Sequence, residues 1–150
     1  PDDLSPLLLA TIGDNARKKG NVEKAEGCYK RLQEFFADSD YADGAAVGLA
    51  EIAFEKGEHD KALVLFNEAT SEKYQGSSKL LDATIGKAKT LTKLKKYDEA
   101  FPIYETIAQT KEWRGEATAQ SLFSECSLRI RNGSRGLQRL TSRVQSVSFC

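Results

Sequence analysis

The sequence has few of the residues on which metal sites and disulfide frameworks depend. In 150 residues there are three cysteines, one histidine (His59) and no methionine. The cysteines are far apart and form none of the close pairs from which structural zinc sites are built. An odd number of widely spaced cysteines also does not make a disulfide framework. We therefore expect no metal, no cofactor and no disulfide scaffold.

Long apolar runs are missing too. No stretch approaches the roughly 20 apolar residues that a membrane-spanning helix needs. The N-terminus lacks the charged start and apolar stretch of a signal peptide. A chain that begins at Pro1 and contains no methionine indicates a fragment or a processed product. We predict no membrane span, and both a periplasmic and a cytoplasmic location stay open.

Net charge is also absent, because 22 Lys and Arg balance 22 Asp and Glu. The balance hides an asymmetry: residues 1–75 hold nine basic and fifteen acidic side chains, and residues 76–150 hold thirteen and seven. The basic half is suited to an acidic partner or nucleic acid, or the two halves could pack head to tail. Nucleic-acid binding ranks low, because no aromatic residues for base stacking interleave with the C-terminal arginines. These are Arg129, Arg131, Arg135, Arg139 and Arg143.

What the sequence does contain is a repeat. A small residue is followed twelve residues later by an alanine and four residues after that by an aromatic, and this pattern recurs after 37 and then 38 residues. A period in this range with helical character inside it is typical of a helical solenoid. The three copies are Gly13, Ala25 and Tyr29; Ala50, Ala62 and Phe66; and Ala88, Ala100 and Tyr104. Places within a unit are numbered below so that the small residue is place eight.

Each unit is predicted to be a pair of helices, helix A and helix B, joined by a tight turn. Gly20 and Gly57 end helix A in units one and two, where glycine suits the left-handed residue after a helix, and Lys95 takes this place in unit three. We predict helices at 6–19, 22–37, 41–56, 59–74, 78–95, 98–111 and 115–131. The repeats then cover 6–40, 41–77, 78–114 and 115–150 of one domain (1–150), the last with a degenerate closing helix at 135–148.

The unit resembles the tetratricopeptide repeat over residues 6 to about 133. The best copy runs from Gly48 through Ala50, Gly57 and Ala62 to Phe66. The departures are an alanine or threonine where a large aromatic often opens helix A, no proline closing a unit, and a period longer than the usual 34. The link at residues 36–43 is similar to the junction in bacterial cell-envelope repeat proteins, such as outer-membrane assembly lipoproteins and the periplasmic coordinator of the Tol-Pal system. That similarity favours the periplasm.

The resemblance implies an all-α, right-handed α-α superhelix of three full repeats plus a partial fourth, with helix A lining its concave face at places two, five, nine, twelve and thirteen. Ala10 and Asp14 stand where some family members hold a peptide carboxylate with Lys and Asn, so that binding mode is not expected. An alternative for each large apolar residue on this face is burial in the core. The predicted partner-binding residues are Val47, Glu51, Phe54, Ile85, Lys89, Lys93, Phe123 and Ile130.

The function that these features favour is a binding module for a protein or peptide. Apolar anchors inside a polar rim are what peptide recognition requires. Self-association into a homo-oligomer through the terminal repeat is the alternative, because solenoids need a polar cap for solubility. An enzyme is not expected, because the sequence has no phosphate-binding glycine loop and no nucleophile with a histidine partner.

Overall fold

The computed structural model describes residues 4–110 and six later positions, 121, 124, 127, 128, 131 and 132. All regular structure in this part of the chain is helical, which confirms the all-α prediction. The chain divides into two compact units, unit 1 at Pro1–Leu94 and unit 2 at Lys95–Cys150, and each is described by itself. Unit 1 holds α1 (Pro6–Lys18), α2 (Val22–Phe35), α3 (Ala42–Glu55), α4 (His59–Ala69), the short 3-10 helix η1 (Glu72–Tyr74) and α5 (Leu80–Lys93). Unit 2 holds α6 (Tyr97–Gln109).

The bounds of five of the first six predicted helices are confirmed to within two residues. The prediction for α4 was wrong, because this helix ends at Ala69 and not at residue 74. After Thr70, Ser71 is extended (φ −70°, ψ 168°), and the chain continues as the separate 3-10 helix η1 and not as α4. The helix predicted at 115–131 and the closing helix at 135–148 lie largely or wholly outside the described residues.

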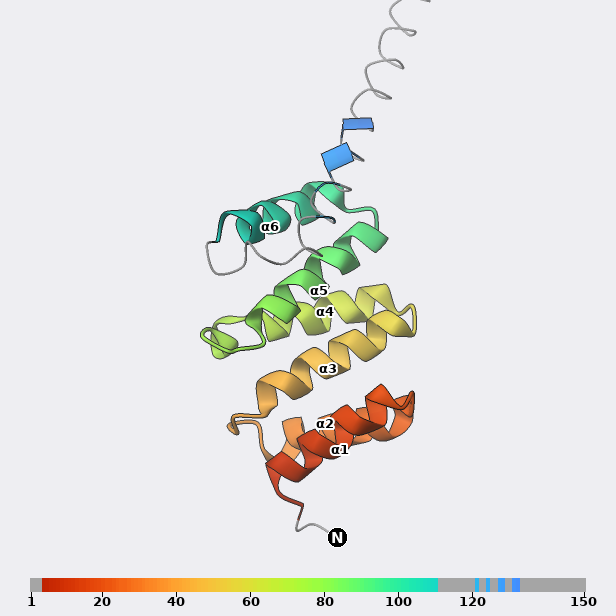
Figure 1. Ribbon diagram of the computed structural model, residues 1–150, viewed down its shortest axis with the longest axis vertical. Helices are drawn as coiled ribbons and strands as arrows, with labels where there is room; N and C mark the ends of the chain where they lie inside the picture. Colours follow the sequence, from red (N-terminus) through yellow and green to blue (C-terminus); the bar gives the residue numbers. More distant parts are fainter. Residues whose placement is uncertain (1–3, 111–120, 122–123, 125–126, 129–130, 133–150) are drawn as a thin grey trace, which may run out of the picture. The chain divides into compact units, whose positions relative to one another are not determined.

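Within unit 1, each helix packs on the next one along the chain, from α1 to α5 (Figure 1). Contacts also join α1 to α3 and α3 to α5, so the three A helices of unit 1 touch one another in succession. This sequential packing is consistent with a helical repeat. The right-handed superhelix, the fourth repeat and the single-domain organisation stay predictions.

The turns between paired helices follow the predicted glycine chemistry. Gly20 and Gly57 have φ of 76° and 79°, in the left-handed region. At each turn the glycine N–H and the next N–H donate back to the end of helix A, at 2.9 and 2.8 Å in the first turn and 3.0 and 2.9 Å in the second. Lys95 occupies the equivalent place with φ of 61°, and it is the one non-glycine residue with positive φ among the described positions.

Replacing Lys95 with glycine is expected to raise the free energy of unfolding by about 0.5–1 kcal/mol. A left-handed conformation costs an L-residue about 1–2 kcal/mol, and the extra flexibility of glycine in the unfolded chain offsets part of the gain. Urea titration followed by circular dichroism measures the change. The matched control is Lys96→Gly, because Lys96 has φ of −85° and gains nothing from glycine. A Lys95→Gly variant no more stable than the control would contradict this account.

Two aromatic rings fix the spacing between successive hairpins. Tyr29 lies between two glycines: a Cβ built on Gly13, in its own hairpin, would be 2.8 Å from Cε1 of the ring, and one built on Gly48, in the next hairpin, would be 2.5 Å from Cε2. Phe66 meets Gly86 of α5 in the same way. The aromatic of helix B therefore faces the next hairpin in both of these cases. A Cβ at Gly13, Gly48 or Gly86 would come within 3.0 Å of a buried ring, so a side chain there would force a shift.

Candidate binding face

The candidate site is the surface that α1, α3 and α5 present together, here called the helix-A face. It consists of the side chains at places two, five, nine, twelve and thirteen of the first three sequence repeats. The contacts of α3 with both α1 and α5 make this surface continuous across unit 1. Its members are Leu7, Ala10, Asp14, Arg17, Lys18, Gly44, Val47, Glu51, Phe54, Glu55, Asp82, Ile85, Lys89, Thr92 and Lys93.

Arg17 is the central cation of this face. Its guanidinium reaches from α1 to α3, where Nη1 pairs with Glu51 Oε2 and Nη2 donates to Glu55 Oε1 at 3.1 Å. Glu51 and Glu55 lie one helical turn apart, so a single planar guanidinium can contact both carboxylates. Burial lowers the pKa of Arg17, but the two carboxylates outweigh it, so the pKa is raised. Arg17 therefore stays charged and links the first two A helices.

The contact with Arg17 compensates the negative charge of Glu51 only in part. Burial raises the pKa of its carboxyl, Arg17 lowers it, and the charges of Asp82 and Glu55 raise it further, so that the net shift is upward. The repulsion by Asp82 comes from α5, on the other side of α3 from Arg17. The two carboxylates of α3 thus share one guanidinium while Asp82 of α5 repels Glu51, and this part of the helix-A face carries surplus negative charge.

Asp14 connects the face to the core. Its Oδ1 accepts a hydrogen bond of 2.6 Å from the Tyr29 hydroxyl. Burial, and then this hydrogen bond to an anion, raise the pKa of Tyr29, so the phenol stays neutral and donates. The ring that spaces the first two hairpins is therefore held from the surface by an exposed carboxylate.

The predicted apolar residues of the face are mostly buried. Val47 is 5% exposed and belongs to a core cluster with Ala50 and Phe66, and Ile85 is 8% exposed. Phe54 is partly buried against the same cluster, with its ring centroid 5.2 Å from that of His59. As they lie here, Val47 and Ile85 offer little surface to a partner. Phe123 and Ile130 lie outside the described residues.

The predicted charged residues are accessible. Glu51 and Glu55 keep 32% and 52% of their side-chain surface exposed even with Arg17 bound. Lys89 is partly buried and Lys93 is exposed, and neither makes an ion pair with a described residue. The partner-binding roles assigned to these four residues stay predictions.

Arg17 and Asp14 were placed on the face by their repeat positions but were not selected as binding residues. The sequence signal that could have identified this ion pair is a basic residue at place twelve of one repeat and acidic residues at places nine and thirteen of the next repeat. Residues 34 and 38 positions apart in sequence come together there. Only the contact between α1 and α3 turns this charge pattern into an ion pair.

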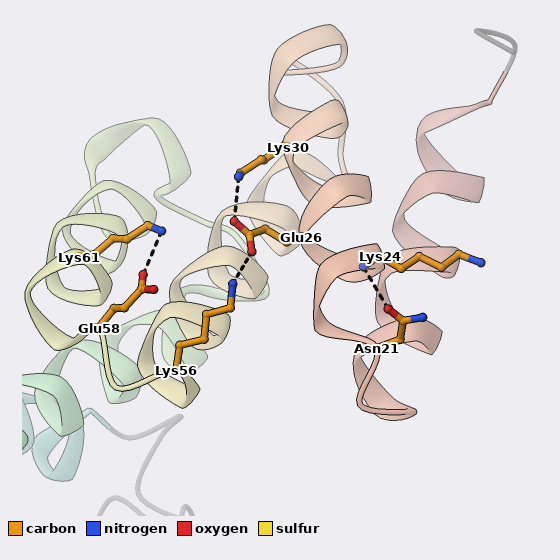
Figure 2. Close-up of polar contacts among 7 residues, drawn as sticks. All are labelled: Asn21, Lys24, Glu26, Lys30, Lys56, Glu58 and Lys61. Carbon is orange, nitrogen blue, oxygen red and sulfur yellow. Dashed lines mark hydrogen bonds and ion pairs between the residues drawn. The ribbon is translucent and has the colours of Figure 1, made fainter.

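A second ionic network lies away from this face, on α2. Glu26 accepts from Lys30 of the same helix at 2.8 Å and from Lys56, at the end of α3, at 2.6 Å (Figure 2). These two hydrogen bonds, that from Lys30 first, lower the pKa of Glu26 from 4.5 to about 2. The network joins the first two hairpins on a side where no partner residue is predicted.

Glu26→Gln is expected to remove a pH-dependent part of the stability. A lowered folded-state pKa means that the carboxylate contributes its full stability above about pH 4.5 and loses it as the pH falls toward about 2. At pH 7 the variant should be less stable by about 0.2–1 kcal/mol, and the difference should vanish between those two pH values. Unfolding titrations from pH 7 to pH 2 test this, with Glu34→Gln on the same helix as control. A difference that is the same at both ends of the range would exclude the mechanism.

Neither a metal centre nor a membrane span is evident in the described residues. In this part of the chain, no three His, Cys, Asp or Glu side chains come together so as to hold a metal ion. None of its helices combines the length and the apolar character needed to cross a bilayer.

Comparison with known proteins gives no identification. No protein-family model and no curated protein matches the chain.

Proposed function

We propose that this chain is a tetratricopeptide-like helical repeat that acts as a protein-interaction scaffold and takes up a protein or peptide segment on its helix-A face. The observation that carries the proposal is the contact of α3 with both α1 and α5, which makes three A helices one exposed, charged surface. Neighbouring A helices joined in this way present side chains at regular intervals, which suits recognition of an extended segment. We expect no catalytic role.

Charge should orient the partner on this surface. The acidic part, at Asp14, Glu51, Glu55 and Asp82, favours a basic residue, and Lys89 and Lys93 favour an acidic one. Burial of Val47 and Ile85 leaves the accessible charged groups as the main determinants of specificity.

A peptide library selected against the intact protein tests the proposal. The selected peptides should bind at least tenfold more weakly to Glu55→Ala and to Lys93→Ala, since both side chains are exposed. Phe54→Ala is less informative, because Phe54 packs on the core and on His59, so its loss would also lower stability. Val64→Ser is the matched control, because Val64 is exposed on helix B (65%) and outside the helix-A face. Peptides that lose affinity only for Val64→Ser would show that the binding surface is elsewhere.

Self-association through the terminal repeat is the second candidate. It concerns residues 115–150, most of which lie outside the described part of the chain, and it stays a prediction.

A further inference from the structure

Two neighbouring A helices carry opposite charges at equivalent places of the repeat. Places nine and thirteen are Glu51 and Glu55 in α3, and Lys89 and Lys93 in α5. Residues four apart lie on one side of a helix, so each helix presents a like-charged pair. The part of the helix-A face formed by α3 and α5 therefore has an acidic half followed by a basic half.

These charges are not neutralised within unit 1. Glu51 and Glu55 share the single guanidinium of Arg17, and the pKa of Glu51 is still raised, by burial first and by Asp82 and Glu55 in addition. Lys89 and Lys93 form no ion pair with any described side chain. Glu55, at 52% side-chain exposure, and Lys93, which is exposed, are both open to a partner.

A surface with one acidic and one basic half is complementary to itself after a two-fold rotation. In a two-fold interface residue i of one copy meets residue j of the other, and j meets i. We propose that the helix-A face binds a second copy of this chain, with the acidic pair of α3 in each copy opposite the lysine pair of α5 in the other. The zero net charge of the chain removes the long-range repulsion that would oppose such pairing.

The inference rests on the proposed function, in that it takes the helix-A face as a binding surface and names its occupant. It differs from self-association through the terminal repeat, because every residue involved lies in α3 or α5. The partly buried Phe54, next to Glu55 in α3, would contribute apolar area near the centre of the interface.

Sedimentation equilibrium of the full chain and two charge-reversal variants tests the inference. The unchanged protein should dimerise, and the dimer should weaken when salt is raised from about 50 to about 500 mM, because charges at the rim are screened. Glu55→Lys and Lys93→Glu should each weaken dimerisation at least tenfold, since each places like charges in contact twice. An equimolar mixture of the two variants should restore the dimer, because each of the two contacts then joins opposite charges again.

The controls separate this result from loss of folding and from binding of a foreign partner. Glu68→Lys makes the same reversal as Glu55→Lys, but at an exposed place on α4, and should leave the dimer unchanged. Lys93 makes no ion pair with a described residue, so Lys93→Glu remains informative even if Glu55→Lys, which loses the Arg17 contact, fails to fold. A protein that is monomeric at both salt concentrations, or variants that stay monomeric when mixed, would overturn the inference. If library peptides nevertheless bind in the Glu55- and Lys93-dependent way described above, the proposed function stands without it.

Discussion

Tyr29→Ala is expected to lower the free energy of unfolding by about 3–5 kcal/mol, the largest effect of any single change in unit 1. The ring is 2% exposed and lies between Gly13 of its own hairpin and Gly48 of the next. Truncation of a buried aromatic loses the transfer free energy of the ring and leaves a cavity that the surroundings fill only in part. Since a domain is stable by about 5–15 kcal/mol in total, the variant should be close to unfolding. Urea titration followed by circular dichroism measures the loss.

Tyr29→Phe separates the ring from the hydroxyl. The ring and its two glycine contacts remain, and only the hydrogen bond to Asp14 is lost, so the cost should be about 1 kcal/mol. If Tyr29→Ala were no more damaging than Tyr29→Phe, the ring would not be what holds the first two hairpins together.

Gly48→Ala is expected to destabilise the protein by about 1–3 kcal/mol, although alanine is the better helix former. The new Cβ would lie 2.5 Å from Cε2 of Tyr29, closer than real Cβ atoms come to a neighbour, and overpacking of a buried ring costs this amount. Gly86→Ala should act in the same direction, because its Cβ would meet the buried ring of Phe66.

A double-mutant cycle shows whether the Tyr29 ring is the cause. In the Tyr29→Ala background there is no ring to meet, so Gly48→Ala should become neutral or stabilise by up to about 1 kcal/mol. Gly27→Ala is the control within the unmutated protein: Gly27 is helical and has nothing within 4 Å of the added Cβ, so helix propensity alone should stabilise it by about 0.5–1 kcal/mol. Equal costs for Gly48→Ala with and without the ring would refute the contact.

The local sequence pattern was sufficient to predict most of the secondary structure. Gly20 and Gly57 end their helices because a left-handed residue is needed there, and that requirement can be read without tertiary information. The end of α4 was mispredicted because the repeat pattern gives no sign of the extended Ser71, which separates α4 from η1.

The candidate face was predictable in outline and not in detail. Repeat places named charged residues of α3 and α5 that are exposed or partly exposed in the structure. They also named Val47 and Ile85, which are buried. A helix position at the boundary between the face and the core can hold an exposed or a buried apolar residue, and the repeat place is the same for both. The accessibility of such a residue depends on how closely the neighbouring helices pack against it.

The sequence by itself determined most of the helices, their turns and their sequential pairing within unit 1, because these depend on spacings of three to four residues and on a pattern that occurs three times. The tertiary structure decided how residues a whole repeat apart interact. It brought Arg17 to Glu51 and Glu55, Tyr29 onto Gly48, and Asp82 near Glu51. Ion pairs and ring contacts act over a few ångströms. The distance between two helices is set by the packing of all the side chains between them, and the sequence of one repeat does not determine it.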